Sequence, residues 1–184
     1  MATVFTRILI GFSPFSGKFN AIPVDSTEAP YGDFECHRSW QAQTYFYPPS
    51  LWYTNTTLSN SSYWPIDYPP LCSYFHRLMA TTTTYHLGDL PLTTPGYMEE
   101  EYVSYMRFWV IVSEYLIFVP SCIFLVHSLD HVENSKLFFN SNHLGAVFTI
   151  LMQPAMLIID HGHFQFNQVM HGFVLLAIAF MLRG

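Results

Sequence analysis

The second half of the chain alternates long apolar runs with short polar stretches. The first run covers residues 103–126, and as a helix it would be about 36 Å long, enough to cross a bilayer with some tilt. The later runs, 144–159 and 169–184, fall short of the roughly 20 residues that a span takes, so each needs flanking residues or protein neighbours. Polar stretches at 127–143 and 160–168 separate the three runs. We therefore expect three membrane helices joined by short loops.

The first half of the chain has no apolar run of this length. Residues 1–18 begin with a mildly apolar stretch that Thr3, Thr6 and Arg7 interrupt, and this stretch is too short to cross a bilayer. It is also a poor match to a secretory signal, so we expect the remnant of a first membrane span whose beginning is absent. Residues 19–102 are rich in Tyr, Trp, Pro, Ser and Thr, which predicts a long loop outside the bilayer.

Two N-x-[ST] glycosylation acceptors begin at Asn55 and Asn60, inside the long loop. They favour a lumenal or extracellular location for that loop. If the loop is lumenal, alternation of the spans places 127–143 in the cytoplasm and returns 160–168 to the lumen. The few Lys and Arg residues help little with orientation, because long loops follow the positive-inside rule weakly.

Composition supports a membrane protein. Hydrophobic residues make up 51% of the chain and charged residues only 11%, against about 25% in a typical soluble domain. The net charge of −6 and the lack of a basic stripe argue against a nucleic-acid partner. Three cysteines, without a C-x-x-C pair, indicate neither an even disulfide framework nor a zinc knuckle. The predicted fold class is mainly α: a polytopic membrane helical bundle with a long lumenal loop of short interfacial helices.

The first polar cluster is the segment GDFECHRSW in the long loop. A helix here would place Asp33, His37 and Trp40 on one face and would pair Glu35 with Arg38 three residues later. A catalytic carboxylate must be positioned and kept ionised, and neighbouring cations do this. The alternative is an ordinary amphipathic surface helix, and composition alone favours that alternative.

The second cluster is the segment YWPIDYPPL. Its prolines predict a stiff, extended turn. Tyr63, Trp64 and Tyr68 suit either a membrane-interface belt or a surface on which sugars stack. A rigid loop that packs aromatic rings at the headgroup level is the more common use of such residues, so the residues alone favour it.

The third cluster, DHGHFQFN, lies at the end of a predicted span. Polar residues at membrane depth are functional candidates by default. Asp160, His161 and His163 suggest a metal site, but a single H-x-H without a second motif is weak evidence for one. Binding of an anionic group by His and Asn donors is the better hypothesis, and a hydrogen-bonded loop that caps two helices is the structural alternative.

Two charges, Arg107 and Glu114, lie seven residues apart inside the first long run. They should face the interior of the bundle, in an ion network or at a substrate. A transporter or channel subunit would carry charges on several spans, and the other two runs have almost none. That hypothesis therefore ranks last.

Together the motifs GDFE-x-x-R-x-W, WY-x-N-[ST]-[ST], YW-x-x-DYPP and D-x-GHFQ-[FY]-N resemble one family. It is the family of endoplasmic-reticulum dolichyl-phosphoglucose-dependent α-1,3-glucosyltransferases, which are multi-pass membrane enzymes of the GT-C fold. The resemblance covers the chain from about residue 31 to the end. The gap between Trp52 and the DYPP motif, with its sequon, resembles the member that adds the first glucose to lipid-linked oligomannose. The pattern at Asp33-Phe34-Glu35-Cys36-His37-Arg38 is closer to the member that adds the second glucose.

The resemblance implies a reaction. Asp33 would be the general base that deprotonates a mannose hydroxyl, while dolichyl phosphate glucose is the donor and the lipid-linked oligosaccharide is the acceptor. Transfer would invert the β-linked donor to an α-1,3 product, with no metal and no cofactor. The resemblance implies that the phosphate is bound by Arg38, His161 and His163. The sugar pocket would be lined by Trp40, Trp64 and Tyr68. The other residues expected to bind substrate are Glu35, Asp67, Asp160 and Gln165.

The chain departs from the family pattern in two ways. The family's usual Gln-Arg-His-Trp is here His37-Arg38-Ser39-Trp40, so no imidazole is present at Ser39. The chain also resembles only the first third of a family member, and by itself we expect it to be inactive. A truncated, non-catalytic membrane protein of the same family is the main alternative. Cys36 and Cys72 would share an oxidising lumen and could pair there.

Overall fold

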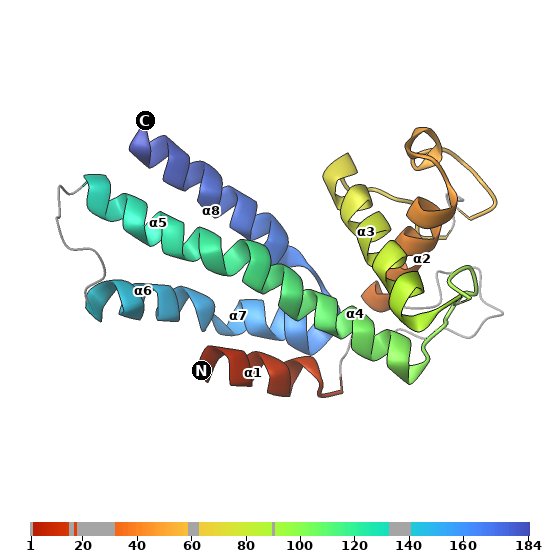
Figure 1. The fold of residues 1–184 in the computed structure, drawn as a ribbon, viewed down its shortest axis with the longest axis horizontal. Helices are drawn as coiled ribbons and strands as arrows, with labels where there is room; N and C mark the ends of the chain where they lie inside the picture. Colours follow the sequence, from red (N-terminus) through yellow and green to blue (C-terminus); the bar gives the residue numbers. More distant parts are fainter. Residues whose placement is uncertain (1, 15–16, 18–31, 59–62, 90, 133–140) are drawn as a thin grey trace. The chain divides into compact units, whose positions relative to one another are not determined.

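The computed structural model describes residues 2–14, 17, 32–58, 63–89, 91–132 and 141–184 (Figure 1). The regular secondary structure of these residues is helical, and no strand occurs among them. The chain divides into two compact units. The polar unit comprises residues 15–106, and the apolar unit comprises residues 1–14 and 107–184. The prediction of a mainly α protein is confirmed over the described residues.

The polar unit is built on two helices, α2 (Asp33–Phe46) and α3 (Pro70–Leu87), with a short 3-10 turn at Pro49–Leu51 between them. Helix α2 carries two acidic residues in its first turn, where the helix dipole stabilises negative charge. Helix α3 begins with a proline, which fits the first turn because that N–H has no helical partner. It ends at Gly88, whose φ of 80° suits glycine.

Helices α2 and α3 pack against each other. The buried core between them and the adjoining loops combines two tryptophans, an isoleucine and two free thiols, with Tyr47 and Trp64 packed around it. Its buried members are Cys36, Trp40, Trp52, Ile66 and Cys72. Both thiols therefore belong to one core, and both are reduced in the structure.

A long helix in three sections begins in the last residues of the polar unit and continues in the apolar unit. It starts as α4 (Glu100–Ser113), passes through a π-helical turn at Glu114–Phe118 and continues as α5 (Val119–Val132). The 30 residues of Glu100–Leu129 are long and apolar enough to cross a membrane. This helix contains the first predicted apolar run.

The second long helix is interrupted by a proline. It runs as α6 (Ser141–Leu151), α7 (Pro154–Met156) and a π-helical segment at Leu157–Phe164. Gln153 is extended, because the residue before a proline is pushed out of the helical region. The stretch His143–Phe164 passes the same length and hydropathy test for a membrane span.

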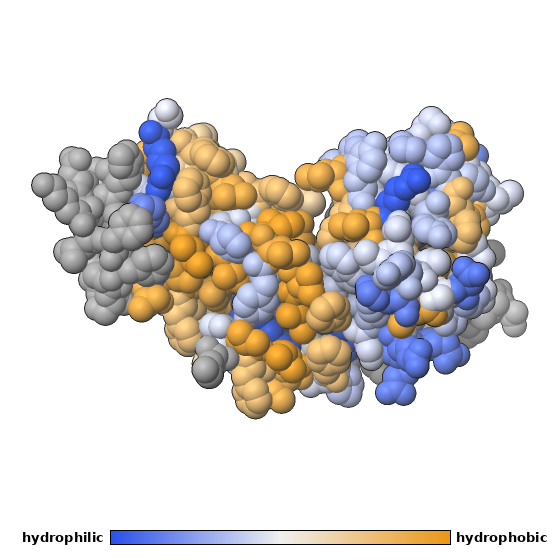
Figure 2. Space-filling model, viewed as in Figure 1, coloured by the Kyte–Doolittle hydropathy of each residue, from blue (hydrophilic) through white to orange (hydrophobic). Residues whose placement is uncertain are grey.

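Two shorter apolar helices complete this unit, α1 (Ala2–Gly11) and α8 (Asn167–Arg183). The third predicted run thus forms a helix of 17 residues, shorter than an ordinary span. Large apolar side chains are exposed on this unit, including Leu116, Ile158, Phe180 and Met181. Figure 2 shows hydrophobic side chains gathered over this part of the chain. Two helices of span length together with this surface indicate a membrane protein.

Close packing of α8 depends on Gly172. A Cβ atom there would lie 2.8 Å from Cγ2 of Ile117 and 3.1 Å from Cα of Phe118. Small residues allow membrane helices to approach closely, and added bulk at such a contact costs about 1–3 kcal/mol. We expect Gly172→Ala to lower the melting temperature of the full-length protein in detergent.

The matched control is Gly145→Ala in α6, where a Cβ atom meets nothing within 4 Å. Alanine favours a helix over glycine, so this variant should melt at an unchanged or slightly higher temperature. Equal melting of the two variants would contradict the packing role of Gly172.

Candidate functional site

In the polar unit, the loop that carries the YWPIDYPPL segment is held against α2. The Trp40 indole Nε1 donates to the carbonyl of Pro65 at 3.1 Å, and the Gln43 amide Nε2 donates to the carbonyl of Trp64 at 2.9 Å. The ring of Tyr68 lies 5.0 Å from the ring of Trp40. The structure therefore brings the first two sequence clusters into contact.

Backbone strain marks two of the motifs. Trp64 has a φ of 40° and Phe164 a φ of 90°, and they are the only non-glycine residues with positive φ in the described part of the chain. Such conformations cost of order 1–3 kcal/mol in bulky residues and cluster at functional sites. Trp64 also has a buried indole Nε1 with no hydrogen-bond partner. The strained backbone makes both loops candidates for a functional role.

Asp33 and Asp67 belong to the two segments that the hydrogen bonds between the YWPIDYPPL loop and α2 join. Asp33 is the first residue of α2 and is half-buried, whereas Asp67 is exposed on the loop. Burial raises the pKa of the Cys36 thiol, and the negative charges of both aspartates raise it further. Burial also raises the pKa of Tyr68, with smaller contributions from Cys72, Asp67, Cys36 and Asp33 in that order.

Glu35 and Arg38 form the ion pair that their spacing predicts, and both are buried. The Arg38 Nε donates to Glu35 Oε2 at 2.6 Å, Nη2 donates to Oε1, and Nη1 donates to the carbonyl of Leu92. The Tyr63 hydroxyl donates to the same carboxylate. Burial lowers the pKa of Arg38, but the bonds and charge of Glu35 outweigh it and raise the pKa overall. The guanidinium is therefore neutralised inside the unit.

A pair of buried histidines joins α2 to α3. The His37 Nδ1 lies 2.8 Å from the His76 Nε2, and the two rings are stacked with an interplanar angle of 3°. The His76 Nδ1 lies 2.8 Å from the carbonyl of Cys72, which can only accept, so this nitrogen carries the proton. His76 Nε2 then accepts from His37 Nδ1. Two neutral imidazoles satisfy this arrangement.

This pair makes stability depend on pH. Burial lowers the pKa of His76 to about 4, and burial together with His76 lowers the pKa of His37 well below its usual value. Between about pH 6.5 and pH 4 the unfolded chain binds more protons than the folded one, so the free energy of unfolding falls as the pH falls. His76 alone accounts for about 3 kcal/mol over that range. We expect a lower melting temperature at pH 5.0 than at pH 7.5.

The variant His76→Gln should flatten this pH dependence, measured on the full-length protein in detergent. The control is His86→Gln, which alters an exposed histidine of the same helix and should leave the dependence unchanged. A pH profile that is identical in both variants would contradict the assignment.

In the apolar unit, Asp160 caps a helix. Its carboxylate accepts from the backbone N–H groups of Asn167 at 3.1 Å and Gln168 at 2.6 Å, at the start of α8. The Asn167 side chain donates both to Asp160 and to Gln165 Oε1. Asp160 and Gln165 are thus drawn into the helix-capping loop that the sequence offered as the structural alternative.

His161 belongs to a buried ion network. Its Nε2 lies 2.8 Å from Glu114 Oε2, and the Arg7 guanidinium pairs with the same carboxylate at 2.6 Å. Arg7 also donates to the carbonyl of Leu151. His163, by contrast, is half-buried and has neighbours of its own. Of the two histidines in the motif, His161 is thus bound to the carboxylate of Glu114 within the apolar unit.

Arg107 and Glu114 do not pair with each other. The Arg107 guanidinium donates to the backbone carbonyls of Ser13, Ile10 and His161. Both charges are buried, as their position in an apolar helix predicts. Sequence spacing did not predict the ion network of Arg7, Glu114 and His161. The presence of an arginine in the apolar stretch at the start of the chain was the one signal that pointed to it.

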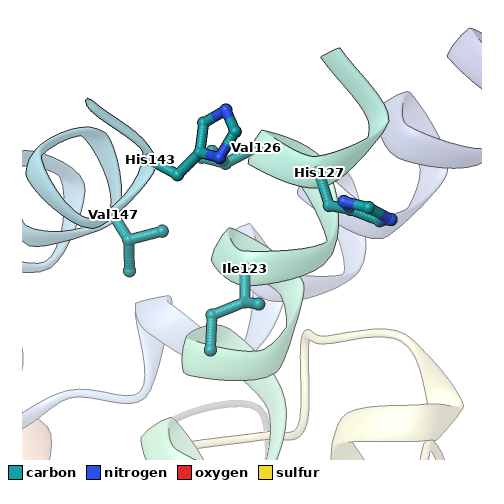
Figure 3. Close-up of a pocket in the computed structure, with 5 residues that line it drawn as sticks. All are labelled: Ile123, Val126, His127, His143 and Val147. Atoms are coloured by element: carbon teal, nitrogen blue, oxygen red, sulfur yellow. The ribbon is translucent and has the colours of Figure 1, made fainter. Parts of the chain in front are cut away.

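Other features do not add to the site. Among the described residues, no three His, Cys, Asp or Glu side chains are grouped so that they could hold a metal ion. A hollow between α5 and α6 is lined by Ile123, Val126, His127, His143 and Val147 (Figure 3). None of its residues belongs to the four motifs, so we place the candidate site elsewhere.

Comparison with known proteins agrees with the motifs. Residues 3–184 match the ALG6, ALG8 glycosyltransferase family. A dolichyl pyrophosphate Man9GlcNAc2 alpha-1,3-glucosyltransferase of Gallus gallus is 38% identical over 79% of this chain and 28% of its own length. A probable enzyme of the same name from Schizosaccharomyces pombe is 36% identical over 100% of this chain and 34% of its own length.

A third relative bears a different name. The dolichyl pyrophosphate Glc1Man9GlcNAc2 alpha-1,3-glucosyltransferase of Debaryomyces hansenii is 35% identical over 79% of this chain and 25% of its own length. The chain spans between a quarter and about a third of the length of these relatives. The family match extends over nearly the whole of the chain and includes all four motifs. The chain belongs to the ALG6, ALG8 glycosyltransferase family.

Proposed function

We propose that the full-length protein transfers glucose from dolichyl phosphate glucose to the lipid-linked oligomannose precursor of protein N-glycosylation. It would do so as a multi-pass enzyme of the GT-C fold in the endoplasmic-reticulum membrane, with the polar unit in the lumen. The observation that supports this proposal is Asp33 at the start of α2, the helix whose Trp40 and Gln43 side chains donate to the backbone of the loop before Asp67. The names of the relatives, which specify α-1,3-glucosyl transfer, support the reaction class.

Asp33 would act as the general base. Its carboxylate takes the proton from a mannose hydroxyl as that oxygen attacks the anomeric carbon of glucose. The bond from that carbon to the phosphate oxygen breaks on the opposite face, and dolichyl phosphate leaves as an anion. Because this leaving group needs little protonation, one base suffices where an inverting glycosidase needs two carboxyl groups. The dipole of α2 stabilises the ionised carboxylate in its first turn.

The phosphate of dolichyl phosphate glucose needs hydrogen-bond donors or cations around it. Sequence resemblance assigns this role to Arg38, His161 and His163. Arg38 and His161 are bound to Glu35 and Glu114 respectively, and both are buried. His163 is half-buried, and its contact with the phosphate stays a prediction from the resemblance.

The test is a transfer assay on purified full-length protein. It is supplied with dolichyl phosphate glucose and with either Man9GlcNAc2 or Glc1Man9GlcNAc2 on a dolichyl pyrophosphate carrier. We expect a product one hexose larger from the Man9GlcNAc2 acceptor. Extension of the glucosylated acceptor alone would identify the enzyme that adds the second glucose, and transfer to neither acceptor would refute the proposal.

A non-catalytic member of the family is the second candidate. Ser39 stands where the family usually has histidine, and this departure lies in the helix that carries the proposed base. Normal membrane insertion without transfer to either acceptor would favour this candidate.

A further inference from the structure

Two side chains of helix α2 hold the backbone of the loop that carries Trp64. The Gln43 amide Nε2 donates to the carbonyl of Trp64 at 2.9 Å, and the Trp40 indole Nε1 donates to the next carbonyl, that of Pro65, at 3.1 Å. Gln43 and Trp40 are three residues apart on α2, so they lie on the same face of the helix. One helix face therefore fixes two consecutive carbonyl groups of the loop.

The loop needs this support because its backbone is strained. Trp64 has a φ of 40°, a conformation that only glycine adopts readily. A strained residue persists only where the surrounding structure determines its position, and such residues cluster at functional sites. The indole Nε1 of Trp64 is buried without a hydrogen-bond partner among the described residues. The bond that fixes Trp64 to α2 is therefore the one from Gln43 to its carbonyl.

Burial separates Gln43 and Trp40 from any ligand. The Gln43 side chain is 1% exposed, and its amide also donates to the Ser39 hydroxyl at 3.1 Å, which fixes the orientation of the amide. The Trp40 side chain is 4% exposed, and its ring packs on Tyr68. Both side chains thus act on the loop, and through it on whatever the loop binds.

We propose that Gln43 and Trp40 are positioning residues, which hold the loop that carries Trp64 in a fixed place relative to Asp33. Asp33 is the first residue of the same helix, so the two hydrogen bonds attach the loop to the rigid element that presents the proposed base. The resemblance implies a place in the sugar pocket for Trp40 and assigns no role to Gln43. The inference rests on the proposed function, since alignment with Asp33 matters only if Asp33 acts on the substrate.

The experiment measures kcat and both KM values of the full-length enzyme with Gln43→Met. Methionine keeps an unbranched side chain of similar length but cannot donate to the Trp64 carbonyl. A displacement of about 1 Å from the catalytic geometry can slow a reaction by about a hundredfold. We expect kcat to fall by about tenfold or more. Each KM should change by less than about threefold, because the residues that would contact substrate are unaltered.

The matched control is Gln41→Met. Gln41 is also buried in α2, but its amide bonds the Met106 sulfur and the Tyr102 hydroxyl rather than the loop. This variant should lose a similar amount of thermal stability and retain the normal kcat. Trp40→Phe keeps an aromatic ring and removes the donor to the Pro65 carbonyl. It should lower kcat as Gln43→Met does, and it carries the test if Gln43→Met does not fold.

An unchanged kcat in Gln43→Met, or an equal fall of kcat in Gln41→Met, would overturn the inference. A change confined to KM would also overturn it, because Gln43 would then act in binding rather than in alignment. If the unaltered enzyme transfers no glucose, the proposed function fails, and hydrogen exchange still tests the support of the loop. Residues 63–69 should exchange faster in Gln43→Met than in Gln41→Met, and equal exchange would overturn the inference.

Discussion

The variant Asp33→Asn in the full-length protein is expected to slow glucose transfer by about 10²–10⁴-fold, the usual contribution of a general base. The asparagine amide keeps the shape of the side chain but cannot take the proton from the acceptor hydroxyl. Asp33 is half-buried at the end of a helix rather than in the core, so the folded amount and the membrane insertion should stay unchanged. The measurement is kcat at saturating donor and acceptor.

The control for this prediction is Asp89→Asn, which removes the same charge from an exposed position of the polar unit. It should retain the activity of the unaltered protein. Transfer by Asp33→Asn at the normal rate would show that another group acts as the base. A loss confined to KM would assign Asp33 to binding rather than to proton transfer.

The helical content of this protein follows from local patterns. The long apolar run at 103–126 and the interrupted run at 144–159 both lie within helices of span length, and Pro154 explains the interruption of the second. The spacing of Glu35 and Arg38 was sufficient to predict their ion pair. Each of these predictions depends only on residues that are close together in the sequence of one helix.

Contacts between distant segments were not predictable in the same way. The His37–His76 bond spans 39 residues, and the Arg7–Glu114 pair spans 107. No spacing rule applies across loops of that length. Sequence could therefore identify Asp33 and Tyr68 as candidates, but only the structure shows that the loop of Tyr68 packs on α2, the helix that begins at Asp33. The capping role of Asp160 likewise depends on where α8 begins.

A second large effect is expected when the buried charge of Glu114 is removed. Its carboxylate bonds both Arg7 and His161, and all three side chains are almost fully buried. Glu114→Gln leaves the Arg7 guanidinium without its counter-charge in an apolar environment. Breaking one partner of a buried ion pair costs about 3–5 kcal/mol. We expect a large fall in the melting temperature of the full-length protein in detergent, together with a lower yield of folded protein.

Replacement of both partners distinguishes an uncompensated charge from simple loss of contacts. The double variant Arg7→Met, Glu114→Leu removes both charges and keeps apolar bulk, and such replacements are often neutral or even stabilising. It should therefore melt at a higher temperature than Glu114→Gln alone, although the double variant loses more polar contacts. Glu99→Gln, which alters an exposed carboxylate, serves as the control and should melt normally. If the double variant is the less stable of the two, the ion network contributes through its hydrogen bonds to Leu151 and His161 rather than through charge compensation.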